Sequence, residues 1–375
     1  MNHRVSPRWT SACAHVGLGV LAATLLAAPI QTASAQGQCK GRPAEHTPAC
    51  DTTPAKAPFE ATGWKTTAVD HFVMEAVDYK KEAAYYSALM NWKIRSDDGK
   101  QAVLDIGDVA TVIIRGGYNP PAPPAPPAPA PGDTTAGRRG GGRGGPRMVP
   151  QVSWDVMSVA IAPWDAKKVE ADLKKRGLNP EHVTDASGYE AFRVKDPDGF
   201  EVEVSNGAYA KARAANKNKA ALASSAPLPF EATNWHTIWL DHISFGVTNY
   251  KESTAWYQTL LGWMPQGDEG SQNETWICDG CGNIIIRGGN PMNTARPMPA
   301  VRRASIGHIS FGIDPFDADK TKAELDARKL NSRQDTGTSK DIHDPTANYK
   351  SYHTTTVGGF DLQISNSTKA NRTVR

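Results

Sequence analysis

The pentapeptide HISFG occurs twice in the sequence, at residues 242–246 and 308–312. Side chains alternate between the two faces of a strand, so His242 and His308 have the same phase on two strands of the same pattern. Imidazole nitrogens at equivalent phase can converge on one divalent metal ion. These two histidines are therefore the first candidates for chemistry.

A second repeated segment supplies oxygen donors. DPDGFEVEVSN at 196–206 aligns with TVGGFDLQISN at 356–366, so that Glu203 corresponds to Gln363. An amide oxygen can bind a divalent ion but leaves its charge uncompensated, which lowers affinity and raises Lewis acidity. We therefore expect Gln363 to be a third metal ligand beside the two histidines. The alternative is that all three are hydrogen-bonded polar residues without a metal.

His353 is the candidate for acid–base chemistry. If the last hairpin is centred on Gly358, His353 lies opposite Gln363 on the same face of the sheet. An imidazole in that place could transfer a proton near neutral pH. An ordinary surface histidine is the alternative interpretation.

The elements that position these residues belong to a long internal duplication. PFEATGWKTTAVDHF at 58–72 returns as PFEATNWHTIWLDHI at 229–243, and VIIRGG at 112–117 matches IIIRGG at 284–289. Chance is a poor explanation for agreement of this length. The chain therefore consists of a first half and a second half built alike.

Each half contains a fainter repeat of its own. The opening segments are rich in β-branched residues and alternate as strands do, and each leads into a helical pattern and further strand-like runs. Helices are predicted at 79–90, 166–176, 251–261 and 318–328. The sequence thus predicts an α+β fold of four βαβββ units.

The remaining segments separate these units. Residues 119–150 are a low-complexity insert, proline-rich and then glycine-rich, which cannot build a core. The predicted organisation is a signal peptide at 1–35, a polar arm at 36–58, a first domain at 59–207 that includes the insert, a linker at 208–228, a second domain at 229–367 and a tail at 368–375.

The first half offers fewer metal-type residues. His71 and Glu203 keep two of the three positions, but Val156 stands in place of the second histidine. Two ligands alone are a poor metal site. We expect His71 and Glu203 to form a buried ion pair or to bind substrate, together with Arg193, the counterpart of His353, which suits an anion.

The N-terminal segment has a basic start, an apolar stretch at 16–30 and the small-residue pattern Ala33-Ser34-Ala35. These features predict a signal peptide cleaved after Ala35, and hence an exported protein, periplasmic or extracellular, that is not attached to a membrane after cleavage. An uncleaved anchor is the alternative. With 42 basic and 39 acidic residues the net charge is +3, too small to indicate a nucleic-acid partner.

Four of the five cysteines follow the predicted cleavage site. In an oxidising compartment an even number favours disulfides. Cys278 and Cys281 flank Asp-Gly, which is typical of a two-residue hairpin turn that sets them opposite one another. We expect disulfides Cys39–Cys50 and Cys278–Cys281 rather than a metal or redox site.

Paired βαβββ units with a histidine on the opening strand and DPDGxxxE in the closing hairpin resemble the vicinal oxygen chelate superfamily. That group includes glyoxalase I, extradiol dioxygenases, fosfomycin-resistance enzymes and bleomycin-binding proteins. The resemblance implies two glyoxalase-like cups, each made of two units, and a divalent metal ion (Zn, Ni, Mn or Fe) inside a cup. The family's ligand positions fall on His242, His308 and Gln363 in the second half.

The resemblance also implies an activity. We expect a lyase or isomerase that acts on vicinal oxygens of a small molecule, as a monomer or homodimer. A metal-free binding protein of the bleomycin-resistance type is the first alternative. An extradiol ring-cleaving dioxygenase is the second, and Gln363 counts against it because iron oxygenases normally use two histidines and one carboxylate.

Overall fold

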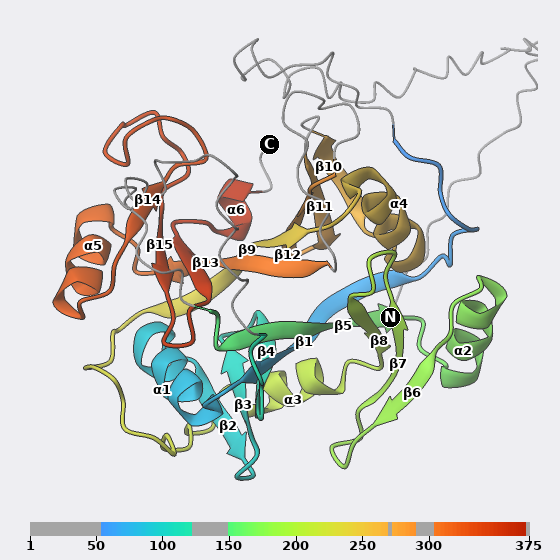
Figure 1. Cartoon of the computed structure of the whole chain (residues 1–375), viewed down its shortest axis with the longest axis horizontal. Coiled ribbons are helices and arrows are strands. Elements are labelled where there is room, and N and C mark those ends of the chain that lie inside the picture. Colours follow the sequence, from blue (N-terminus) through green and yellow to red (C-terminus); the bar gives the residue numbers. More distant parts are fainter. Residues whose placement is uncertain (1–53, 122–148, 269–271, 290–303, 373–375) are drawn as a thin grey trace, which may run out of the picture. The chain divides into compact units, whose positions relative to one another are not determined.

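The duplicated pattern forms two eight-stranded mixed sheets, one for each half of the sequence (Figure 1). The computed structural model describes residues 54–121, 149–268, 272–289 and 304–372, all within one compact unit, residues 35–375. The α+β class and the four βαβββ units are confirmed.

The first half contains β1 (Lys65–Ala76), α1 (Tyr79–Met90), β2 (Lys93–Asp97), β3 (Gln101–Ile106), β4 (Ala110–Gly116), β5 (Val152–Ala162), α2 (Ala166–Lys175), β6 (Glu181–Thr184), β7 (Glu190–Lys195) and β8 (Glu201–Ser205). The connector to the second half contains α3 (Ala208–Asn216). The second half contains β9 (His236–Gly246), α4 (Tyr250–Leu261), β10 (Met264–Asp268), β11 (Gln272–Cys278), β12 (Gly282–Arg287), β13 (Ser305–Asp314), α5 (Ala318–Ala327), β14 (Arg333–Asp335), β15 (Ser351–Thr355), β16 (Asp361–Ser365) and α6 (Lys369–Arg372).

Each of the four unit helices begins at a capping side chain. The side-chain oxygens of Asp78, Asp165, Asn249 and Asp317 accept hydrogen bonds from backbone N–H groups in the first turn of the helix. Such caps satisfy donors that have no partner inside the helix. The helices accordingly lie within one residue of their predicted bounds at both ends.

In each sheet the opening strands of two units pair antiparallel at the centre, β1 with β5 and β9 with β13. The closing strand of each unit lies parallel to its own opening strand, as β16 does to β13. The strand order is β2-β3-β4-β1-β5-β8-β7-β6 in the first half and β10-β11-β12-β9-β13-β16-β15-β14 in the second. This topology places the histidines of the opening strands beside the closing strand that carries Glu203 or Gln363.

Aromatic pairs anchor the helices to the sheets. Tyr86 stacks on Trp92 with ring centroids 4.4 Å apart, and Tyr257 stacks on Trp263 at 4.8 Å. All four rings are buried. These aromatics therefore belong to the hydrophobic core.

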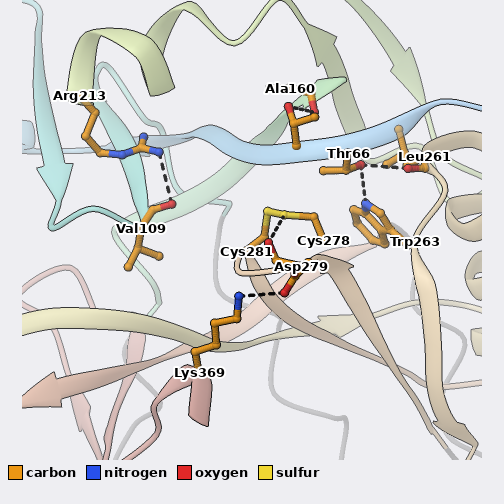
Figure 2. Close-up of a disulfide and its surroundings, with 11 residues drawn as sticks. Thr66, Val109, Ala160, Arg213, Leu261, Trp263, Cys278, Asp279, Cys281 and Lys369 are labelled. Atoms are coloured by element: carbon orange, nitrogen blue, oxygen red, sulfur yellow. Dashed lines mark hydrogen bonds and ion pairs between the residues drawn. A yellow bond between two sulfur atoms is a disulfide. The ribbon is translucent and has the colours of Figure 1, made fainter. Parts of the chain in front are cut away.

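The same tryptophans tie the two halves together. Trp92 Nε1 donates a hydrogen bond to Thr237 Oγ1 at 2.9 Å. In the matching position Trp263 Nε1 donates to Thr66 Oγ1 at 3.1 Å (Figure 2). The two halves therefore meet through equivalent contacts related by the duplication.

The closing turn of the first half contacts a helix of the second. Tyr257 on α4 donates a hydrogen bond to Asp196 Oδ2 at 3.0 Å, and the Thr248 N–H donates to Asp198 Oδ2 at 2.9 Å. Burial raises the pKa of Asp196 to about 6. Both aspartates of DPDG are therefore used in this joint.

The corresponding joint lies between α1 and the turn at 356–359. Here the carboxyl group belongs to Glu82 on the helix and not to the turn. Glu82 is 1% exposed and accepts a hydrogen bond from Thr356 Oγ1 at 3.4 Å. A Cβ atom at Gly358 would collide with the Glu82 side chain. Glycine at 358, where DPDG has Asp198, therefore leaves room for the Glu82 side chain.

The cysteine hairpin differs from its prediction in register. The Cys281 N–H donates to the Cys278 carbonyl at 3.2 Å, which closes a β-turn and leaves three residues between β11 and β12. Cys278 consequently pairs with Gly282, so the expected two-residue turn was wrong. The Cα atoms of Cys278 and Cys281 nevertheless lie 5.0 Å apart with their sulfur atoms adjacent (Figure 2).

Several predictions fall on residues outside the described ranges. These are the signal peptide, the Cys39–Cys50 pair, and most of the polar arm and of the insert. The predicted linker is partly helical, as α3 shows. Among the helices of the described ranges, none is both long and apolar enough to cross a membrane.

Candidate metal and substrate site

A cavity of about 520 Å³ lies at the second sheet, lined from β9, β11, β12, β13, β14, β16 and α6. His242, His308 and Gln363, the three predicted ligands, all line it. Most of the other lining side chains are polar or charged, among them Arg287 and Asp335. The structure thus gathers the three residues in one solvent-reachable space, and their role as ligands stays a prediction.

The two HISFG histidines face each other through the same ring nitrogen. His242 Nε2 lies 3.0 Å from His308 Nε2. His242 is buried, and β9 and β13 pair so that Ser310 lies opposite it. Equivalent phase on paired strands therefore produces the convergence expected from the sequence.

A buried aspartate orients His242. Asp241 Oδ2 lies 2.8 Å from His242 Nδ1, and Asp241 Oδ1 lies 2.6 Å from Arg372 Nε. Burial raises the pKa of Asp241, but its interactions with His242 and Arg372 outweigh burial and hold the pKa well below its usual range. The charged aspartate places the proton of His242 on Nδ1 and leaves the lone pair of Nε2 toward His308.

His308 is held in its neutral form. Burial, followed by the nearby His242 and His353, lowers the pKa of His308 to about 2. A neutral imidazole has a free lone pair, which is the form that ligates metal ions. The electrostatics of the site therefore keep His308 ready to act as a ligand.

The side-chain oxygen of Gln363 is a hydrogen-bond acceptor for which the described residues supply no donor. Gln363 Nε2 donates to Ser351 Oγ at 2.8 Å, which fixes the orientation of the amide. Its Oε1 is buried and has no hydrogen-bond partner among the described residues. A buried polar atom normally finds a partner, so this oxygen marks a place for an ion or a ligand donor.

His353 lies opposite Gln363 in the β15–β16 pair. Its Nδ1 is 2.7 Å from Asp361 Oδ1 and its Nε2 is 3.2 Å from Asp335 Oδ2. Burial lowers the pKa of His353, but the hydrogen bonds to Asp335 and Asp361 outweigh it, and the net shift is upward. His353 thus lies between two carboxylates that favour its protonated form, beside the cavity rather than in its described lining.

The donor set fits a divalent ion. Two imidazole nitrogens bound to one ion at roughly 2.1 Å lie about 3.0–3.4 Å apart, and the observed separation of 3.0 Å is at the short end of this range. Gln363 adds a buried oxygen, and Asp241 supplies the carboxylate that usually supports a ligating histidine. A second set, His308, His353 and Asp361, has ligand atoms all within 4.8 Å of one another.

The corresponding residues of the first half satisfy one another. Arg193 donates to Glu203 Oε1 through Nε at 2.9 Å and through Nη2 at 2.7 Å. Tyr189 donates to Glu203 Oε2, and His71 Nε2 lies 3.8 Å from the same oxygen. These contacts form the buried ion pair expected from the sequence, with Arg193 rather than His71 as the main cation.

An aromatic side chain completes this cluster. The Tyr209 ring lies 4.6 Å from His71 and 5.3 Å from Tyr189 between ring centroids. In the second half Lys369 takes the position of Tyr209 and pairs with Asp279 at 2.9 Å (Figure 2). The Tyr209 ring therefore packs against the first cluster, whereas Lys369 at the matching position of the second half points away to the cysteine hairpin.

Sequence reasoning missed several residues around the site. The first missed pair is Asp335 and Asp361, which contact His353. The second is Asp241, which contacts His242, and Arg372, which contacts Asp241. One signal was available for Asp241, because aspartate precedes the histidine of the opening strand in both halves, in VDH and in LDH. Asp335 lies on a three-residue strand that has no strong pattern.

The comparisons with known proteins agree with this fold. The sequence matches no protein-family model and no curated protein. Among solved structures, a Mn(II)-bound glyoxalase from Novosphingobium aromaticivorans is similar with a TM-score of 0.51 and 16% identity over 80% of this chain and 82% of that chain. A catechol 2,3-dioxygenase gives 0.51 and 12% over 80% and 88%, and a 2,3-dioxygenase from Pseudomonas sp. KL28 gives 0.50 and 13% over 80% and 92%.

These structures share the fold of the vicinal oxygen chelate superfamily, and this chain has that fold in two tandem glyoxalase-like domains. The resemblance seen in the sequence is therefore confirmed at the level of the fold.

Proposed function

We propose that the chain is a divalent-metal-dependent enzyme of the glyoxalase-like kind, acting on vicinal oxygens of a small molecule as a lyase or isomerase. The ligands of the ion are His242, His308 and Gln363. One observation carries the proposal: the two histidines face each other at 3.0 Å between Nε2 atoms in a cavity where the buried oxygen of Gln363 has no described donor.

The ion, when bound, would polarise the oxygens of the substrate as a Lewis acid. The protein supplies the rest. Asp241 keeps the lone pair of His242 Nε2 directed at His308, and Ser351 fixes the amide of Gln363. Because all three ligands are neutral, they leave the charge of the ion uncompensated, which favours stabilising negative charge on the substrate.

We also propose that His353 moves a proton in this reaction. It lies across the β15–β16 pair from Gln363, and its ring is 5.0 Å from that of His308 between centroids. The hydrogen bonds from both of its ring nitrogens to Asp361 and Asp335 hold the proton and the ring orientation. Substrate would have to replace one of these contacts to receive the proton.

Metal analysis tests the proposal. Protein purified without chelators should contain about one ion per chain, and Gln363→Glu should tighten binding by roughly tenfold or more because it adds a charge to the ligand set. Glu203→Gln, the mirror change in the first half, is the matched control and should leave binding unchanged. Wild-type protein that binds no zinc, nickel, manganese or iron would overturn the proposal.

A metal-free binding protein is the second candidate, and one observation favours it. The His242–His308 contact of 3.0 Å is also a hydrogen-bond distance, so the pair can be satisfied without an ion. In that case His242→Ala should weaken a small-molecule ligand without changing metal content. Ring cleavage is the third candidate; oxygen uptake with catechols as substrates, lost in His308→Ala, would support it.

The first half binds no ion in this proposal. A substrate-binding role for His71, Glu203 and Arg193 stays a prediction, and their mutual contacts favour a structural role. Binding of a small molecule that survives His308→Ala and is lost in Arg193→Met would establish the substrate role. Mass measured in solution distinguishes the two expected states, a monomer and a homodimer.

Export is proposed from the N-terminal sequence alone. Cell fractionation should find the protein outside the cytoplasm with Gln36 as its first residue. In that compartment we propose disulfides Cys39–Cys50 and Cys278–Cys281, the second of which has adjacent sulfur atoms. Four reactive thiols in the mature denatured protein without reductant would contradict both bonds.

A further inference from the structure

We propose that a divalent cation has a second binding position in the second half, formed by His308, His353 and Asp361. The ligand-type atoms of these three side chains lie within 4.8 Å of one another. A single ion with ligand distances of roughly 2.1–2.4 Å can bridge such a span. The position goes beyond the proposed function, because it uses a carboxylate and does not require the Gln363 oxygen.

The strand register explains why a carboxylate is available here. Asp361 and Gln363 are two residues apart on β16, so their side chains lie on the same face of the sheet. Asp361 Oδ1 lies 2.7 Å from His353 Nδ1, and these two atoms would become neighbouring ligands. Asp361 therefore supplies, two residues before Gln363 and on the same face of β16, the negative charge that the neutral amide lacks.

Asp335 supports the position from outside. Its Oδ2 lies 3.2 Å from His353 Nε2, the nitrogen on the other side of the ring. A carboxylate bonded to the second nitrogen of a ligating histidine fixes the ring and makes it a stronger ligand. His353 would then bind through Nδ1 while Asp335 orients it, as Asp241 orients His242.

The first half shows what the same strand positions do without an ion. Val156 replaces His308, and Arg193 and Glu201 replace His353 and Asp361. There the guanidinium of Arg193 lies 3.4 Å from Glu201 Oε2, so a permanent cation is built into the protein. In the second half a histidine takes this place, which leaves room for an exchangeable cation.

His308 belongs to both sets, so the two positions compete. The set with Asp361 carries a negative charge, whereas His242, His308 and Gln363 are neutral. The charged set should hold a free divalent ion more tightly. We therefore infer that the ion occupies the position at Asp361 when no substrate is present.

Equilibrium dialysis with Mn²⁺, Zn²⁺ and Co²⁺ separates the two positions. Asp361→Asn, which keeps the side-chain shape, should weaken ion binding at least tenfold, and His242→Ala should weaken it less than threefold. Glu201→Gln, the first-half counterpart of the aspartate change, should have no effect. Thermal unfolding of each variant shows that it is folded.

The opposite pattern would overturn the inference. If Asp361→Asn binds as wild type while His242→Ala loses the ion, the position at Asp361 does not exist and the ion resides at Gln363. His353→Gln gives an independent check and should match Asp361→Asn in its loss. Failure of the proposed function is distinct, since it shows as a lack of metal-dependent turnover in the wild type whatever the dialysis result.

Discussion

The two cups use the same strand positions for opposite purposes. In the first, Arg193 lies between Glu201 and Glu203, so the protein itself supplies a permanent cation to both carboxylates. In the second, His353 lies between Asp335 and Asp361 while Gln363 is neutral and faces a cavity. The duplicated positions thus hold a permanent cation in the first half and an imidazole beside a cavity in the second.

The largest difference between the cups should appear in ion binding. His308→Ala removes the histidine shared by both ligand sets, and we expect a complete loss of bound divalent ion, more than 100-fold in affinity. Elemental analysis after dialysis measures it. His71→Ala is the matched change in the first half and should retain the ion; an equal loss there would break the comparison.

The next effect concerns stability and should be larger in the first cup. Arg193→Met leaves the carboxylate of Glu203, whose side chain is 2% exposed, without its cation. Removing one partner of a buried ion pair costs about 3–5 kcal/mol of unfolding free energy. Urea unfolding measures the loss.

His353→Gln is the counterpart in the second cup. The side chains of Asp335 and Asp361 are 32% and 43% exposed, so water can replace the lost contacts. We expect a loss of only about 1 kcal/mol. Equal losses of unfolding free energy in the two variants would mean that Arg193 and His353 stabilise their cups to the same extent.

The two joints between the halves should lose stability over different pH ranges, because burial raises the pKa of Asp196 in one joint to about 6 and that of Glu82 in the other to about 7. Burial raises the pKa of Glu82 from its ordinary 4.5 to about 7, with Oε2 lacking a described hydrogen-bond partner. Between these values the folded state binds more protons than the unfolded state, so the free energy of unfolding falls as pH rises. At one pKa unit per roughly 1.4 kcal/mol, the loss approaches about 3 kcal/mol by pH 8.

Glu82→Gln should remove this loss and leave the variant more stable than wild type above pH 7. Thermal unfolding between pH 4.5 and pH 8.5 measures the trend. Ser253→Ala, which changes the residue at the same helix position in the second half, is the control and should keep the wild-type pH dependence. A Glu82→Gln variant with unchanged dependence would show that this carboxyl group does not titrate in the range.

The smallest predicted effect tests the equivalence of the halves. Thr66→Val and Thr237→Val each remove one acceptor for a tryptophan N–H, at 3.1 Å and 2.9 Å. Each change should cost about 1 kcal/mol. Losses that differ by more than about 1 kcal/mol would show that the two joints are not energetically equivalent.

Local patterns predicted most of the fold. The helix bounds followed from caps such as Asp78 and Asn249, and the four units followed from the repeats. The pairing of the cysteine hairpin was missed because the register shifts between Trp276 and Cys278 on β11, an irregularity that no turn signature announces.

The site was only partly predictable for a physical reason. The phase of His242 and His308 can be read from alternation, and their convergence follows from it. The partners of His353 come from Asp335, on a strand whose pairing partner begins sixteen residues later, and from Asp361 on the opposite arm of the last hairpin. Such partners are chosen by tertiary packing, which one sequence does not reveal.

The pairing of β1 with β5 tolerates connections of very different length between β4 and β5. The connection between β4 and β5 runs from 117 to 151, and the matching connection between β12 and β13 runs from 288 to 304. Doubling the length of a connection costs only about 0.6 kcal/mol of closure entropy, and the longer connection has roughly twice as many residues as the shorter. The fold is therefore nearly indifferent to the length of this connection, which makes it a permissive site for gain, loss or replacement of whole segments.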